Sequence, residues 1–305
     1  MAVPQHKIWE RLISPVVSFL IDEEGLERYA QSIDWKKQSD RFHRDDVIVP
    51  SYYSSYKFRG IEGGYLNPKV VVSYDPIIQY LLAPHENLVR QAVIDAIQVQ
   101  PRRILDLGCG TGSTTLMLKQ AFPQAQVIGL DLSAYMLVMA ENKATNTGLD
   151  ILWRHGSAEK TAFPDASFDL VTASLLFREI PIAVSQAILQ ECFRLLVVGG
   201  QVLILDSNQK ALRQLEWLKD VFEEPYLRDY ATLNLHESMN KAGFSALSDK
   251  DVWWMHQVTS GVKPISKVDV TKYNTVKQSV SKSTDSTIDN QDLEDLGSPV
   301  FGIKA

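Results

Sequence analysis

The chain has 305 residues, of which 45% are apolar and 22% are charged, so it is too apolar for a disordered protein and too mixed for a membrane protein. Its formal charge of -6 comes from 31 basic and 37 acidic residues, and no stretch concentrates Lys and Arg away from acidic neighbours. Nucleic acid is therefore not an expected partner. Cys109 and Cys192 cannot build a disulfide framework, and no cationic-then-apolar leader opens the chain. We expect a cytoplasmic protein without stable membrane association.

Residues 1–95 are rich in aromatic residues and irregular in pattern. Six of the eleven tyrosines fall between residues 52 and 80, at Tyr52, Tyr53, Tyr56, Tyr65, Tyr74 and Tyr80, among prolines and glycines. Apolar spacing predicts helices over Val16–Tyr29, Ile77–Leu82 and Leu88–Ile97, with a break at Pro84. We interpret this region as a helical, aromatic N-terminal cap.

Residues 96–262 alternate short apolar runs with longer amphipathic stretches. Strands are predicted at Arg103–Leu107, Val127–Leu130, Ile151–Arg154, Phe168–Ala173 and Gln201–Leu205, and helices at Ser113–Ala121, Ala134–Thr147, Ile182–Leu196, Lys210–Phe222 and Leu233–Ala242. Phe244–Val258 can supply two final strands. The alternation predicts an α/β domain with a doubly wound, Rossmann-like and mostly parallel sheet.

Residues 263–305 form a polar segment dominated by Ser, Thr, Asp, Asn, Gln and Lys. Such a segment cannot bury enough apolar surface to offset the entropy lost on ordering. We expect a C-terminal tail there.

The stretch Ile104-Leu-Asp-Leu-Gly-Cys-Gly-Thr-Gly112 carries the most chemical information. It places Gly108, Gly110 and Gly112 between a predicted strand and a helix, where glycines let backbone approach a ligand closely. A dinucleotide fingerprint would have glycine at position 113, which is Ser113. Asp106 lies two residues before the first glycine, so we expect its carboxylate to face the ligand. That charge would repel a pyrophosphate and favour a cation.

Asp131 ends the next predicted strand, 23 positions after Gly108. A carboxylate at about this spacing holds ribose hydroxyls in nucleotide-binding folds, and it disfavours a ribose phosphate. A cationic head group joined to an unphosphorylated adenosine describes S-adenosylmethionine, which is the expected cofactor.

With these motifs the sequence resembles the class I S-adenosylmethionine-dependent methyltransferases. The matching blocks cover about 100 residues in the correct order, namely Asp106–Gly112, Gly129–Ser133, Gly156–Glu159, Phe163–Val171 and Arg194–Gly200. The resemblance implies a seven-stranded sheet of order 3-2-1-4-5-7-6 with the last strand antiparallel. It also implies that Asp106 and Gly108 hold the methionine amino group, Asp131 the ribose, Leu132 a face of the adenine, and Ser157 and Ala158 its edge. Gly110, Gly112, Ser174 and Tyr74 complete the expected cofactor site.

Two blocks depart from the family pattern. Ser157 stands where relatives commonly have Asp, and Arg178-Glu-Ile-Pro181 stands where relatives often have His-Glu-Leu-Pro or paired histidines. The stretches Glu62–Pro68, Tyr74–Pro76 and Glu224–Tyr230 resemble small-molecule methyltransferases of cyanobacteria and plastids.

Candidate catalytic residues on the acceptor side are Glu179, just past the fourth predicted strand, and His236. Arg178 could clamp an acidic acceptor, although an exposed arginine is the simpler expectation, and His85 is expected at the surface. Tyr74 or Tyr80 could contact cofactor or acceptor. No His, Cys, Asp or Glu cluster has metal-ligand spacing, so no metal is expected. We predict that residues 50–85 and 208–232 together cap an aromatic acceptor cavity.

The leading hypothesis is a methyltransferase that acts on an aromatic or apolar small molecule in secondary metabolism, for example the nitrogen or oxygen of an indole alkaloid. A quinone-pathway C-methyltransferase is the alternative within the same class. A non-catalytic binding protein with this fold, or an enzyme that uses the cofactor for cyclisation, are alternatives of other classes. The oligomeric state is left open.

Overall fold

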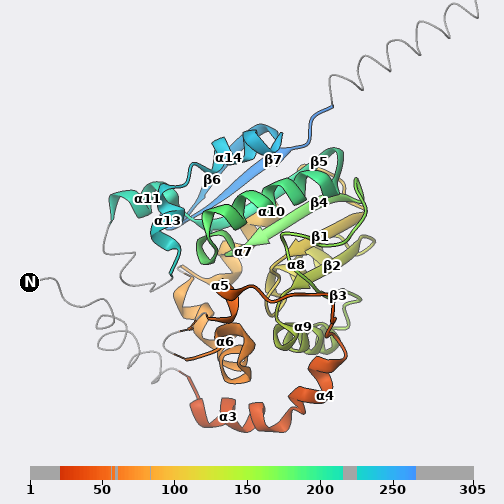
Figure 1. Ribbon diagram of the computed structural model, residues 1–305, viewed down its shortest axis with the longest axis vertical. Helices are drawn as coiled ribbons and strands as arrows, with labels where there is room; N and C mark the ends of the chain where they lie inside the picture. The colour runs from red at the N-terminus through yellow and green to blue at the C-terminus, as the bar shows by residue number, and fades with distance from the viewer. Residues whose placement is uncertain (1–20, 56, 59–60, 83, 216–224, 266–305) are drawn as a thin grey trace, which may run out of the picture. The chain divides into compact units, whose positions relative to one another are not determined.

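The computed structural model describes residues 21–265, apart from residues 56, 59–60, 83 and 216–224. Within these residues, seven strands form a sheet of order β3-β2-β1-β4-β5-β7-β6 (Figure 1). Strands β1 to β5 are parallel to one another, and β7 runs antiparallel to β5 and β6. The expected doubly wound fold, its strand order and its antiparallel last strand are confirmed. The strands are β1 Arg103–Leu107, β2 Gln126–Asp131, β3 Leu152–His155, β4 Phe168–Ser174, β5 Leu196–Ser207, β6 Ser245–Val252 and β7 His256–Val262.

Helices connect the strands and also build the N-terminal part. They are α3 Glu23–Ser32, α4 Trp35–Asp40, α5 Ser51–Ser54, α6 Pro68–Leu81, α7 Glu86–Asp95, α8 Ser113–Ala121, α9 Ala134–Thr147, α10 Ile182–Leu195, α11 Gln209–Gln214, α13 Leu227–Thr232 and α14 Leu235–Ala242, with 3-10 turns η2 Gly64–Leu66 and η3 Phe177–Glu179. The predicted bounds of β1, α8 and α9 are confirmed to the residue.

Helix α6 is longer than expected, because Pro76 lies inside it and does not end it. The helix begins with Pro68 at its first turn, where a missing N–H is harmless, and Asn67 caps it through Lys69 N at 3.0 Å. Val70, Val71 and Val72 on its first half are almost fully buried. This packing holds the helix together across the proline, which the local sequence pattern could not show.

Other predicted bounds were wrong at specific positions. The first described helix, α3, begins at Glu23, because Asp22 accepts a hydrogen bond from Gly25 N at 2.8 Å and caps it. Residues 16–20 of the helix expected over Val16–Tyr29 lie outside the described part. Strand β5 begins at Leu196, since Gly199 and Gly200 continue backbone pairing with Lys263. Of the helix expected over Lys210–Phe222, α11 ends at Gln214 and residues 216–222 are not described.

Alternate residues of the strands face two layers of helices. Leu105 and Leu107 of β1 join a core cluster with α10 and α14, whereas Ile104 joins a cluster with α7 and α8 on the other face. A further cluster joins α6 to Met136 and Met139 of α9. Through this cluster the N-terminal segment packs beside the carboxyl ends of the first strands, where Gly108 and Asp131 lie.

The part of the chain that the structure describes holds no helix with both the length and the apolar character needed to cross a bilayer. All the strands and helices named above belong to the compact unit Met1–Pro264. The expected tail falls almost wholly outside the described residues, and the division at residues 95 and 263 remains a prediction.

Candidate functional site

A cavity of about 820 Å³, its mouth included, opens at the carboxyl ends of β1, β2 and β4. Three parts of the chain line it: the backbone of the loop Gly108–Gly112, called the glycine loop below, the ends of the strands, and tyrosines of the N-terminal segment. The lining residues are Tyr52, Tyr53, Tyr65, Tyr74, Gly108, Gly110, Leu130, Asp131, Leu132, Met136, Gly156, Ala158, Glu159, Ser174, Leu175, Leu176, Glu179, Ile180 and Ile188. The cavity therefore lies at the edge of the sheet where open α/β folds bind ligands.

The glycine loop needs glycine at two positions for different reasons. Gly110 has a φ of +54°, and a Cβ there would meet no atom within 4 Å, so this glycine faces open space in the cavity. Gly112 has a φ of +80°, and a Cβ there would lie 2.6 Å from Cη2 of Trp153. Gly112 thus serves helix packing and does not line the cavity, contrary to the expected ligand contact.

Asp131 is the buried acid of the cavity. Its side chain accepts hydrogen bonds from Gly110 N and Ser133 N, both at 2.8 Å. The residue is only 7% exposed, and burial raises the pKa of its carboxyl to about 6. Asp131 therefore joins the glycine loop to the end of β2 and faces the cavity, as the sequence predicted.

Asp106 lies behind the loop and not in the cavity wall. Its carboxylate is buried and accepts hydrogen bonds from Thr115 Oγ1 at 2.6 Å and Thr172 Oγ1 at 2.7 Å. Burial raises its pKa. The expectation that this carboxylate faces a ligand was wrong in geometry, because hydroxyls from α8 and β4 occupy both of its oxygens. Its charge still acts on the loop from behind.

Most of the remaining predicted cofactor residues line the cavity, and one does not. Leu132, Ala158, Ser174 and Tyr74 line the cavity together with Gly108. Ser157 does not, since its Oγ accepts a hydrogen bond from Glu159 N at 3.2 Å and caps a local turn. The adenine contact expected of Ser157 would have to come from its neighbours.

Sequence reasoning missed His155, which ends β3. Its Nε2 lies 2.9 Å from Leu132 O, and its Nδ1 accepts a hydrogen bond from Arg44 N at 3.2 Å. Burial lowers the pKa of this imidazole, so the neutral ring with a proton on Nε2 fits both contacts. His155 thereby joins Leu132 to the N-terminal segment. In the sequence, the one indication of this role is the position of His155 at the end of a strand.

Four tyrosines of the N-terminal segment form the aromatic wall. The Tyr52 hydroxyl donates to Glu159 Oε1 at 2.9 Å, and Tyr65 packs edge-on against Tyr74 with ring centroids 5.8 Å apart. Tyr80 is exposed. None of the described residues between 208 and 232 lines the cavity, and residues 216–224 lie outside the described part. Of the predicted cap, residues 50–85 supply the wall.

On the acceptor side, the structure brings Glu179 into the cavity wall, on the 3-10 turn η3 after β4. It does not bring His236 there: α14 packs on α10 and β6, and His236 Nε2 lies 3.0 Å from Asp249 Oδ2. Arg178 is 3% exposed, and its guanidinium lies 3.9 Å from Asp206, so the expectation of a surface arginine was wrong. His85 is exposed as expected and caps α7.

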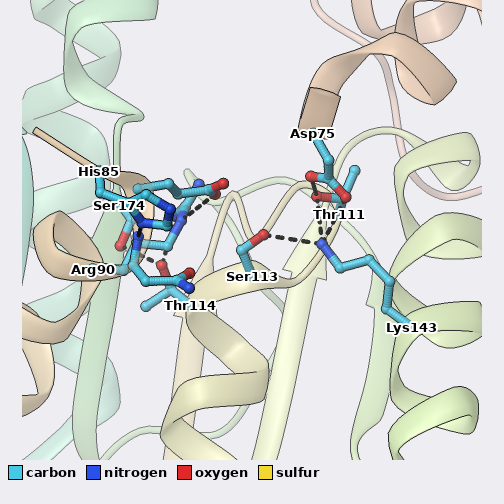
Figure 2. Close-up of polar contacts among 10 residues, drawn as sticks. Asp75, His85, Arg90, Thr111, Ser113, Thr114, Lys143 and Ser174 are labelled. Carbon is cyan, nitrogen blue, oxygen red and sulfur yellow. Dashed lines mark hydrogen bonds and ion pairs between the residues drawn. The ribbon is translucent and has the colours of Figure 1, made fainter. Parts of the chain in front are cut away.

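Two polar networks flank the start of α8 (Figure 2). On one side, Lys143 Nζ of α9 contacts Asp75 Oδ2 of α6 at 2.8 Å, Ser113 Oγ at 2.9 Å and Thr111 Oγ1 at 3.2 Å. On the other side, Arg90 of α7 reaches Thr114, which contacts Ser174. Neither network was predicted, because their members are far apart in the sequence. No group of three or more His, Cys, Asp or Glu among the described residues could hold a metal ion.

The central part of the chain is similar to known methyltransferases. Residues 104–200 match the family model described as methyltransferase domain. The chain is 40% identical over 117 residues to a demethylmenaquinone methyltransferase of Thermus thermophilus, covering 38% of this chain and 52% of that protein. It is 36% identical over 135 residues to a ubiquinone/menaquinone biosynthesis C-methyltransferase of Xanthomonas oryzae, covering 43% and 51%. The chain thus spans about half the length of these curated relatives.

Solved structures support the fold at low sequence identity. A putative O-methyltransferase of Nostoc punctiforme superposes with a TM-score of 0.54 at 16% identity, covering 78% of this chain and 69% of that chain. A Haemonchus contortus phosphoethanolamine N-methyltransferase 2 superposes with a TM-score of 0.51 at 18% identity, covering 71% and 61%. Residues 104–200 therefore form a methyltransferase domain, and the order of its strands and the fold of the solved neighbours agree with the Rossmann-like fold of such domains.

Proposed function

We propose that this protein transfers the methyl group of S-adenosylmethionine to an apolar, aromatic small molecule. The observation that carries the proposal is that one cavity joins the glycine loop and Asp131 to the tyrosine wall and Glu179. In this proposal the cofactor and the acceptor occupy neighbouring parts of that cavity, as direct transfer between two bound molecules requires.

The residues of the cavity fit this cofactor. Gly110 leaves open space where a side chain would stand, and Asp131 offers a buried carboxylate that can accept hydrogen bonds from ribose hydroxyls. Leu132 and Ala158 provide apolar surface for the adenine. No Lys, Arg or His is among the described residues that line the cavity, which suits a ligand with a positive sulfonium and no phosphate.

When bound, the cofactor supplies an activated methyl group on a sulfonium, so the hard chemistry is not the protein's task. The chain has to hold the acceptor in line and exclude water, and this positioning can contribute about 7–11 kcal/mol. The tyrosine wall can orient an aromatic ring by packing. Glu179 can accept a proton from an acceptor that loses one, which typically contributes about 10²–10⁴-fold in rate.

The acceptor has two candidates. The four tyrosines favour an aromatic ring such as an indole or phenol, methylated on nitrogen or oxygen in secondary metabolism. The names of the curated relatives favour the second candidate, a quinol ring methylated on carbon. Both acceptors are apolar and aromatic, so the tyrosine wall suits either class.

A turnover assay with a panel of acceptors tests the proposal. The full-length chain is incubated with S-adenosylmethionine and with indoles, phenols or a prenylated naphthoquinol, and S-adenosylhomocysteine and product masses are measured. We expect release of S-adenosylhomocysteine and a gain of one methyl group by at least one aromatic acceptor. Methylation of the naphthoquinol alone would select the second candidate. Calorimetry that detects no cofactor binding at millimolar concentration would favour a non-catalytic protein, and products without an added methyl group would favour cyclisation.

A further inference from the structure

A chain of hydrogen bonds runs from α7 to the wall of the cavity. Glu86 Oε1 accepts from Arg90 Nε at 2.7 Å, Arg90 Nη1 donates to Thr114 Oγ1 at 2.8 Å, and Thr114 Oγ1 donates to Ser174 Oγ at 3.1 Å. Figure 2 shows Arg90, Thr114 and Ser174 grouped on one side of the turn that begins α8. Glu86, Arg90 and Thr114 are 9%, 5% and 2% exposed, so water does not compete for these contacts.

The direction of the hydrogen bonds is set by the arginine. A guanidinium has donors and no acceptor, so Thr114 Oγ1 must accept from Arg90. A hydroxyl has a single proton, and that of Thr114 is given to Ser174. Ser174 Oγ therefore accepts from Thr114, and no acceptor among the described residues takes the proton of Ser174. Because Ser174 lines the cavity, its hydroxyl is available there as a donor.

The position of Ser174 indicates which part of the ligand it would meet. Leu107 of β1 pairs with Ala173 of β4, so Ser174 lies beside Gly108 at the start of the glycine loop. The ribose end is marked by Asp131 on β2, on the other side of β1. The methionine part must then extend toward β4. It carries an ammonium, which cannot accept a hydrogen bond, and a carboxylate, which can.

We propose that Arg90 and Thr114 are positioning residues that make the Ser174 hydroxyl a fixed donor to the carboxylate of the methionine part of the cofactor. This inference rests on the proposed function, since it names a contact within that cofactor site. The second residue of α8 is Thr114, so the positive end of that helix dipole also favours an anionic group there. The proposed contact concerns binding of the cofactor and does not identify the acceptor.

Calorimetry with two ligands tests the inference on the full-length chain. The first ligand is S-adenosylhomocysteine, and the second is its decarboxylated analogue, which keeps the amine and lacks only the carboxylate. Thr114→Val, which removes the hydroxyl and keeps the shape, is expected to weaken S-adenosylhomocysteine about tenfold and to leave the analogue unchanged. Ser174→Ala is expected to show the same selectivity, and the double variant should lose no more than Ser174→Ala alone.

Matched variants separate positioning from damage to the fold. Thr114→Ser keeps the hydroxyl and should restore the selectivity for S-adenosylhomocysteine, whereas Thr145→Val, on the exposed face of α9, should change neither affinity. If Thr114→Val and Ser174→Ala weaken the affinity for both ligands equally, or for neither, this inference is overturned, whereas the proposed function is not. Failure of the wild-type chain to bind either ligand would overturn the proposed function as well.

Discussion

The ionisation of Asp131 links cofactor affinity to pH. The ionised carboxylate of Asp131 can accept hydrogen bonds from ribose hydroxyls at both oxygens, whereas the protonated acid has one O–H donor. Burial raises the pKa of this carboxyl to about 6. We therefore expect the affinity for S-adenosylhomocysteine to be constant above pH 7 and to fall about tenfold per pH unit well below pH 6. Calorimetric titrations between pH 5 and 8 measure this.

Asp131→Asn is the control for that titration. The amide keeps the shape of the side chain but replaces one acceptor oxygen by a donor, so affinity should drop by about 1–3 kcal/mol at pH 7. The variant should also lose the pH dependence around pH 6. A variant with the wild-type pH profile would show that another group titrates.

Glu179 is a carboxylic acid residue that lines the cavity, on the turn after β4. If it takes a proton from the acceptor, Glu179→Gln should lower kcat by about 10²-fold or more and leave cofactor affinity unchanged. Steady-state kinetics combined with calorimetry measure both. Glu159→Gln is a useful comparison, because Glu159 also lines the cavity but accepts from Tyr52. Wild-type turnover in Glu179→Gln would remove this residue from the mechanism.

At the scale of elements, Lys143 ties α6 and α9 to the glycine loop through Asp75, Thr111 and Ser113. Lys143→Met removes these contacts from a site that is still about a quarter exposed, so the loss of unfolding free energy should be modest, about 1 kcal/mol. The larger effect should be local. We expect faster hydrogen exchange of α6 amides and a several-fold weaker cofactor affinity, because the loop loses its support.

Lys36→Met provides the comparison for this ion pair. Lys36 pairs with Asp40 within α4, at 3.0 Å and in full contact with solvent. Its removal should change neither the exchange of α6 nor cofactor affinity. If Lys143→Met behaves in the same way, the contacts at Lys143 do not support the glycine loop.

At the scale of the whole molecule, His256 of β7 makes folding sensitive to acid. It is 1% exposed, and burial together with the positive charges of Arg178 and Arg90 lowers its pKa to about 3. The unfolded chain binds a proton here below about pH 6.5 and the folded chain does not, so stability is lost as the pH falls. Between pH 7 and pH 4.5 this group should remove about 3 kcal/mol.

Asp131 has the opposite effect on the pH dependence of stability. Its pKa is raised in the folded chain, so the folded chain binds the proton more tightly than the unfolded chain does and gains stability as the pH falls. The comparison of variants separates the two groups. From pH 7 to pH 4.5, His256→Gln should gain about 3 kcal/mol on the wild type, and Asp131→Asn should lose about 2 kcal/mol relative to it. Urea unfolding at each pH measures the differences, and a constant gap for His256→Gln would exclude a buried neutral imidazole.

Local sequence patterns determined the class of fold and the location of the cavity. The apolar runs at β1, β2 and β4 and the loop from Gly108 to Gly112 each depend on neighbours in the chain, and so does Asp131 at the end of a strand. The carboxyl ends of parallel strands share one edge of the sheet. Residues that follow such strands are therefore brought together by the fold class itself.

Only the tertiary structure decided which side chains face the cavity. Asp106 has the sequence position of a ligand contact, but Thr115 and Thr172 from two other elements occupy its oxygens. His236 has suitable chemistry, but α14 packs on α10 and β6 and places it beside Asp249, outside the cavity lining. The tyrosine wall and the Arg90–Thr114–Ser174 chain join segments separated by tens of residues. Periodicity reports only the local conformation of the chain, whereas such contacts depend on how whole elements pack.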